Sequence, residues 1–178
     1  LAVVPDSVPL VQAKYLILDK GGEAAKAMEF VESRARDDKQ GVYRRMLVDV
    51  YRHQKNYEGA EKLLRGLVAD NPNDGNLAAG LVEVVSLSAA DAMAAGDAER
   101  LRNLEGTAES LIRDYRAKFP ANLAIIQAEC DQPARRGDYT RAVEITGEVE
   151  KVAKHSSVGP LLRARLFSSQ NRPHDVAK

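Results

Sequence analysis

Few residues in this 178-residue chain have the types and spacing that catalysis or metal binding needs. The three histidines, His53, His155 and His174, lie far apart, and none has a cysteine, histidine or aspartate at the spacing of a metal site. The single cysteine, Cys130, occupies a small-residue position of a helical pattern, where a packed thiol is expected. No serine stands in the pattern of a nucleophile elbow. The sequence therefore predicts no enzyme activity, no metal and no cofactor.

Two loop-like segments resemble ligand loops only superficially. Residues 70–75 read DNPNDG, but Pro72 would stand at a ligand position of a calcium loop and Leu81 at the closing glutamate. The pair Gly21-Gly22 is followed by Glu23, without the lysine that a phosphate-binding loop requires. Neither segment predicts a bound ion or nucleotide.

The charge balance limits the classes of partner. Lys and Arg together number 26, and so do Asp and Glu, so no basic excess is present to neutralise the phosphates of a nucleic acid. A protein or peptide is the expected partner. No run of 18 apolar residues occurs, so no membrane insertion is expected in this segment. One cysteine cannot form an internal disulfide and leaves the compartment unknown, with the cytoplasm slightly favoured.

The elements that must position any binding residues are helices. Apolar residues recur at offsets of 0, 3, 4, 7 and 8, which is the stripe of an amphipathic helix, most clearly at Ala60, Leu63, Leu64, Leu67 and Val68. No two alternating runs flank a tight hairpin turn, so strands are not predicted. The pattern predicts an all-α fold.

The helical stripes recur at a regular interval. Their anchor positions lie 36, 48, 34 and 34 residues apart and are Ala24, Ala60, Ala108, Ala142 and Val176. A glycine- or asparagine-containing turn precedes each anchor, and these residue types end a helix through a left-handed backbone position. Each unit is therefore expected to be a helix, a short turn and a second helix, with the small anchor at the crossing of the two helices.

This pattern resembles the tetratricopeptide repeat (TPR) family, whose signature is W-x2-L-G-x2-Y, then A-x3-F, then P over 34 residues. The copy in residues 42–74 keeps four of these residue types, and Leu64 stands at the phenylalanine position; the matches are Leu47, Tyr51, Ala60, Leu64 and Pro72. Arg44 and Val48 replace the tryptophan and the glycine. Four further copies are in phase with this one, though each is degenerate.

The resemblance implies a right-handed α-solenoid of antiparallel helix pairs, a TPR-like superhelix. The whole of residues 1–178 is interpreted as a single solenoid fragment of a longer protein. The expected repeats span residues 5–38, 41–74, 75–122 and 123–156, with 157–178 truncated. Because a truncated repeat leaves an uncapped apolar face, self-association through that end is a further expectation.

Two irregular places interrupt the repeat. The 48-residue interval is interpreted as a lengthening of both helices by about two turns each, around residues 89–104. This lengthening is either a tolerated insertion or a ridge for docking a partner. Pro133 falls inside a predicted helix, so the helix is expected either to stop near Asp131 or to kink.

The resemblance also implies where a partner binds, because in TPR proteins the first helix of each unit lines a concave groove. The polar residues expected on that face are Arg45, Asp49, Arg52, Asn76, Glu83 and Gln127. Arg45 and Arg52 could bind a carboxylate through paired N–H donors, and Asn76 could bind a peptide backbone. Alternatively, Arg45, Asp49 and Arg52 form pairs within their own helix and nothing more.

The resulting hypothesis is a non-catalytic scaffold or adaptor for protein–protein interaction, which binds a peptide or partner segment in the groove. Two alternatives remain open: a peptide-sensing regulatory module and a helper domain of a larger multidomain protein. A sensor needs a deep groove with converging polar groups, whereas a scaffold needs a broad patch.

Overall fold

The computed structural model describes residues 7–152 and 158–170, and every regular element in these ranges is an α-helix. The chain divides into two compact units, Leu1–Pro72 and Asn73–Lys178. His155, His174 and Val176 lie outside the described residues, as do residues 157 and 171–178 of the truncated final repeat. The all-α prediction is confirmed.

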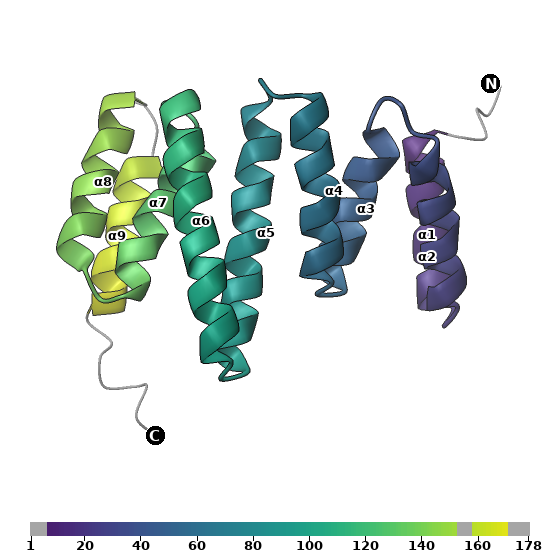
Figure 1. Ribbon diagram of the computed structural model, residues 1–178, viewed down its shortest axis with the longest axis horizontal. Coiled ribbons are helices and arrows are strands. Elements are labelled where there is room, and N and C mark those ends of the chain that lie inside the picture. Colours follow the sequence, from purple (N-terminus) through teal and green to yellow (C-terminus); the bar gives the residue numbers. More distant parts are fainter. Residues whose placement is uncertain (1–6, 153–157, 171–178) are drawn as a thin grey trace. The chain divides into compact units, whose positions relative to one another are not determined.

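The first unit consists of two helical hairpins (Figure 1), formed by α1 (Val8–Lys20), α2 (Ala24–Arg36), α3 (Val42–His53) and α4 (Tyr57–Asp70). Helix α2 packs against both α1 and α3, and the two first helices, α1 and α3, also touch. The hairpin partners are antiparallel because only a few residues join them.

The second unit repeats this arrangement (Figure 1), in α5 (Gly75–Ala94), α6 (Ala98–Lys118), α7 (Leu123–Arg135), α8 (Tyr139–Val152) and α9 (Val158–Gln170). Helix α6 packs against α5 and α7, helix α8 packs against α7 and α9, and the first helices α5 and α7 touch. Within the units, the second helices α2, α6 and α8 therefore each pack against the first helix before them and the first helix after them.

Four hairpin turns share one hydrogen-bond pattern. In each, a backbone N–H just before the second helix donates to a carbonyl five residues earlier, as in Asn56 to Tyr51 at 2.8 Å and Asp138 to Pro133 at 2.9 Å. This is the Schellman pattern, and the residue before the donor has a positive φ. Glycine has this φ in three turns, but Lys55 has it in the second, at 57°. The prediction that asparagine or glycine ends that helix is thus wrong: Asn56 instead caps α4, accepting from the Gly59 N–H.

Replacing Lys55 with glycine is expected to raise the free energy of unfolding by about 1 kcal/mol, because a left-handed conformation costs a residue with a Cβ more than it costs glycine. The neighbouring Gln54, with φ of −83°, is the matched control. Gln54→Gly should lower stability, since glycine there adds unfolded-state entropy and the side-chain hydrogen bond between Gln54 and Tyr15 is lost. Urea denaturation measures both, and a loss of stability in Lys55→Gly would contradict the turn geometry.

The predicted lengthening of one helix pair is confirmed. Helices α5 and α6 have 20 and 21 residues, against 13 and 14 in α7 and α8, and they extend past those helices in Figure 1. In α4 and α8 the buried alanine is the fourth residue, whereas in α6 it is the eleventh, Ala108. The seven added residues are close to two helical turns, so Ala108 keeps its orientation toward the core.

The crossing alanines are the most regular feature of the core. Ala60, Ala108 and Ala142 are fully buried, as the repeat pattern predicts. The predicted anchor Ala24 is exposed, and this prediction is wrong: Ala27, the fourth residue of α2, is buried in its place. Ala24 is the first residue of the helix, where the chain has not yet reached its crossing with α1.

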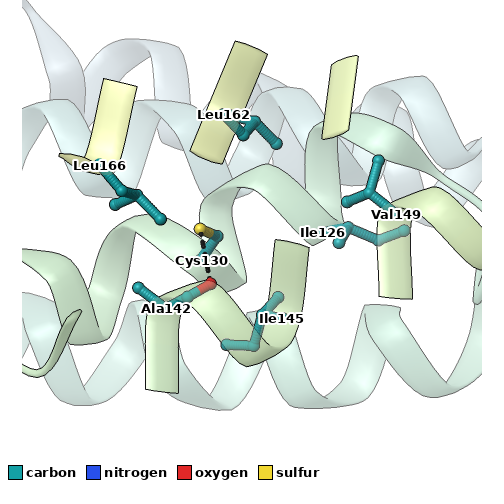
Figure 2. Packing of buried hydrophobic residues seen from close by; sticks show 7 residues of the cluster. All are labelled: Ile126, Cys130, Ala142, Ile145, Val149, Leu162 and Leu166. Atoms are coloured by element: carbon teal, nitrogen blue, oxygen red, sulfur yellow. Dashed lines mark hydrogen bonds between the residues drawn. The ribbon is translucent and has the colours of Figure 1, made fainter. Parts of the chain in front are cut away.

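In the apolar cluster of α7, α8 and α9, small residues allow the helices to approach closely (Figure 2). The Cys130 thiol donates to the Ala142 carbonyl oxygen at 3.3 Å, so a side chain of α7 touches the backbone of α8. Ile126, Ile145 and Val149 fill the space beside this contact. Cys130 is fully buried, which confirms it as a packed thiol.

Pro133 does not end its helix, which continues to Arg135, so the predicted stop near Asp131 is wrong. The proline lies in the last turn of α7 and has no N–H to donate to the carbonyl oxygen four residues before it. Its own carbonyl oxygen accepts from Arg136 and Asp138 in the hairpin turn.

Helix α5 is long and apolar enough to cross a membrane by length and composition, although its sequence has no uninterrupted run of 18 apolar residues. Just over half of its most apolar stretch, 56 %, is buried within the structure. Since α5 packs against α6 and α7, its apolar composition is that of a core helix.

Candidate polypeptide-binding site

Three of the six predicted binding residues lie on one face of α3 in the first unit. Arg45 and Asp49 are exposed and Arg52 is half-buried, at helical offsets of 0, 4 and 7. Other faces of the same helix bury Met46, Leu47 and Val50 in the apolar cluster of that unit. Amphipathicity of α3 therefore presents the three charged side chains together.

The other three predicted residues lie in the second unit, on α5 and α7. Asn76 and Glu83 are exposed and seven residues apart, so they share a face of α5, and Gln127 is half-buried on α7. The Asp74 carboxylate accepts from the Asn76 N–H at 3.0 Å and caps α5. The Asn76 amide group is thus held at the first turn of a capped helix.

The orientation of α3 depends on two polar contacts at its ends. The Asp38 carboxylate accepts from the N–H groups of Tyr43, at 2.5 Å, and Arg44, at 3.0 Å, and so caps the start of the helix. Near its end, the Tyr51 hydroxyl donates to Glu32 of α2 at 2.9 Å. Burial, and then the Glu32 carboxylate, raise the pKa of Tyr51, so its hydroxyl remains a donor through the neutral pH range.

The charged face of α3 contains an internal pair. Arg52 and Asp49 are 3.5 Å apart, which realises part of the alternative that these residues pair within their helix. Such a pair, with the carboxylate largely exposed, contributes about 0.5 kcal/mol or less. Replacing Asp49 by a carboxylate of a partner as the group paired with Arg52 would therefore cost little. A guanidinium can bind such a carboxylate through two parallel N–H groups.

None of the three best-defined cavities within the described residues is lined by the six predicted residues. In the first unit, a cavity of about 770 Å³ lies between the ends of α2 and α3 and includes Phe30 and Tyr43. In the second unit, cavities of about 560 Å³ and 360 Å³ lie on α6, the larger also on α7 and α8. The predicted binding faces are open helix surfaces.

Sequence reasoning missed the ionic contacts of Arg116 on α6. Its Nε lies 3.0 Å from Glu129 of α7, its Nη2 lies 2.5 Å from Glu148 of α8, and its Nη1 donates to the carbonyl oxygen of Pro120. We call this arrangement the Arg116 clamp. Residues 116 and 148 are separated by 32 positions, so no local pattern could have indicated the contact.

Among residues 7–152 and 158–170, no group of three or more histidine, cysteine or acidic side chains could hold a metal ion. His53 lies at the end of α3, where its Nδ1 is 2.8 Å from the Asp49 carbonyl oxygen. The ring of His53 therefore contacts the backbone at the end of its own helix.

The comparisons with known proteins are informative only at the level of structure. No family model matches the sequence, and no curated protein is similar to it. The chain superposes on TTC0263, a thermophilic TPR protein of Thermus thermophilus, with a TM-score of 0.66 and 17 % identity, covering 91 % of this chain and 82 % of that one. It also superposes on a monomeric mutant of IFIT1 solved with Gppp-AAAA, with a TM-score of 0.63 and 13 % identity over 94 % of this chain and 43 % of that one. The chain therefore has a TPR-like fold.

Proposed function

We propose that this chain is a non-catalytic scaffold that binds a polypeptide segment on the polar faces of its first helices. The observation that carries the proposal is the amphipathicity of α3, which exposes charged residues on one side and buries the apolar cluster on the other. Family likeness supports the class of partner, since TPR-like folds generally bind proteins or peptides. The equal numbers of cationic and anionic residues do not favour a nucleic acid.

The open character of the predicted faces favours the scaffold over the peptide sensor. A sensor needs converging polar groups in a deep groove, whereas Arg45 and Asp49 lie on an exposed helix surface outside the three cavities. Long exposed side chains suit a partner that covers a broad area and supplies several weak contacts.

The test is a double charge reversal, Arg45→Glu with Arg52→Glu, in the full-length protein purified from its native cells. The co-purifying polypeptide should bind at least about tenfold more weakly, because a guanidinium–carboxylate pair becomes a repulsive pair of like charges. Affinity measured by calorimetry with the identified partner gives the result.

The matched control reverses the same number of charges on another helix of the same unit, with Lys62→Glu and Arg65→Glu on α4, both of which are exposed. This control should retain the wild-type affinity. If both double variants weaken binding equally, a general electrostatic attraction acts and the α3 face is not the site.

A further inference from the structure

The cavity of about 560 Å³ in the second unit is built from three helices. Its lining comes from α6, α7 and α8 and consists of Glu109, Ile112, Arg113, Arg116, Ala117, Glu129, Gln132 and Glu148. The volume is within the range of small-ligand sites, which is also enough for a short stretch of peptide. None of the residues proposed above for partner binding belongs to it.

The carboxylates of this cavity are already matched by cations. Glu129 and Glu148 are held by the Arg116 clamp, and Glu109 pairs with Arg136. The clamp is itself largely buried, with 18 % of the Arg116 side chain exposed, so it fixes the relative positions of the three cavity walls. The glutamates therefore do not make the cavity a site for a cation.

Gln132 is the unusual residue of the lining. Only 9 % of the residue is exposed, but its side-chain amide atoms are not fully buried, because they face the cavity that the residue lines. An amide that lines a cavity offers one acceptor and two donors to whatever enters.

Arg113 supplies a second unused group. It lies on α6 at the exposed rim of the same cavity, and within the described part of the chain no carboxylate pairs with it. An amide at the buried side and a guanidinium at the rim complement a peptide group followed by a carboxylate. Ile112 and Ala117 also line the cavity and provide apolar surface.

We propose that this cavity is a second polypeptide-binding site, which takes an extended segment carrying an acidic side chain. The amide of Gln132 pairs with the backbone of the segment, and Arg113 binds its carboxylate. The site is independent of the α3 face, since it lies in the other unit and uses no residue of that face.

The first test titrates the protein with the peptide N-acetyl-Ala-Asp-Ala-amide and follows the side-chain amide signals of Gln132 by NMR. Wild-type protein should show saturable shifts, and Gln132→Met should bind at least about tenfold more weakly, because the hydrogen bonds between the amide and the peptide backbone are lost. The same variant should melt within about 2 °C of wild type, because methionine keeps the length of the side chain and the amide it replaces faces the cavity. A lower melting temperature with unchanged binding would mean that Gln132 is structural, and would overturn the proposal.

The second test separates the carboxylate from the backbone contact. N-acetyl-Ala-Asn-Ala-amide should bind wild-type protein more weakly than the aspartate peptide does. In the Arg113→Gln variant, the affinity for the aspartate peptide should fall to that of wild-type protein for the asparagine peptide. Arg102→Gln, an exposed change on the same helix outside the cavity, is the matched control and should have no effect. Equal binding of the two peptides to wild-type protein would contradict the role of Arg113. The Arg45→Glu, Arg52→Glu protein should bind the aspartate peptide normally, so failure of the α3 proposal and failure of this one are distinguishable.

Discussion

The Ala142→Leu variant is expected to lose about 3 kcal/mol of unfolding free energy, at the upper end of the usual cost of overpacking a core. Ala142 is fully buried, and its carbonyl oxygen is 3.3 Å from the Cys130 sulfur, so no space exists for three more carbons between α7 and α8. Figure 2 shows apolar side chains of α7, α8 and α9 gathered around this point. The two helices must therefore separate to accept leucine.

Urea denaturation of the variant measures this loss. The matched control is Ala124→Leu, the same chemical change at an exposed position of α7 in the same unit. Its stability should stay within about 0.5 kcal/mol of wild type. If Ala142→Leu is as stable as the control, small residues at the helix crossings are not what holds the hairpins together.

The second large effect is expected from the Arg116 clamp. Arg116→Met should lower the unfolding free energy by about 2 kcal/mol, because charged hydrogen bonds to Glu129 and Glu148 are lost and the Glu129 carboxylate stays partly buried. Adding Glu129→Gln to Arg116→Met should recover part of the loss, since the unpaired charge is then removed.

The surface pair of Arg141 and Glu144 is the control for this prediction. Its atoms are 2.9 Å apart, close to the distances in the clamp, but 54 % and 60 % of its side chains are exposed. Arg141→Met should therefore cost less than about 0.5 kcal/mol. Equal losses for Arg116→Met and Arg141→Met would show that the clamp contributes no more than an ordinary surface pair.

Much of the fold could be predicted because its determinants are local. Ala60, Ala108 and Ala142 could be recognised because each lies in an apolar stripe with the helical period. The seven residues added to α5 and to α6 are close to two turns, so they do not change which face of the helix is apolar. Ala24 was confused with Ala27 because both are alanines in one stripe, and only the start of α2 decides which of them meets α1. The left-handed conformation of Lys55 was missed because lysine does not favour this conformation, so its residue type carries no signal for it.

The binding surfaces were predictable only in part. The spacing of Arg45, Asp49 and Arg52 is enough to place them on one face of α3, since a helix has a fixed period. The cavity of the second unit depends on contacts between α6, α7 and α8, which no local pattern contains. One signal was present: Gln132 stands seven residues after the buried Ile125, a polar residue on a face that is otherwise apolar.

The most direct test of the central claim is site-specific photo-crosslinking of the full-length protein in its native cells. A photo-reactive benzophenone residue replaces Asp49 on α3 in one protein and Lys62 on α4 in another, both at exposed positions of the same unit. Binding of a polypeptide on the first-helix face predicts one dominant protein adduct at position 49 and little at position 62. Equal adducts at the two positions, or a nucleic acid as the main adduct at position 49, would contradict it.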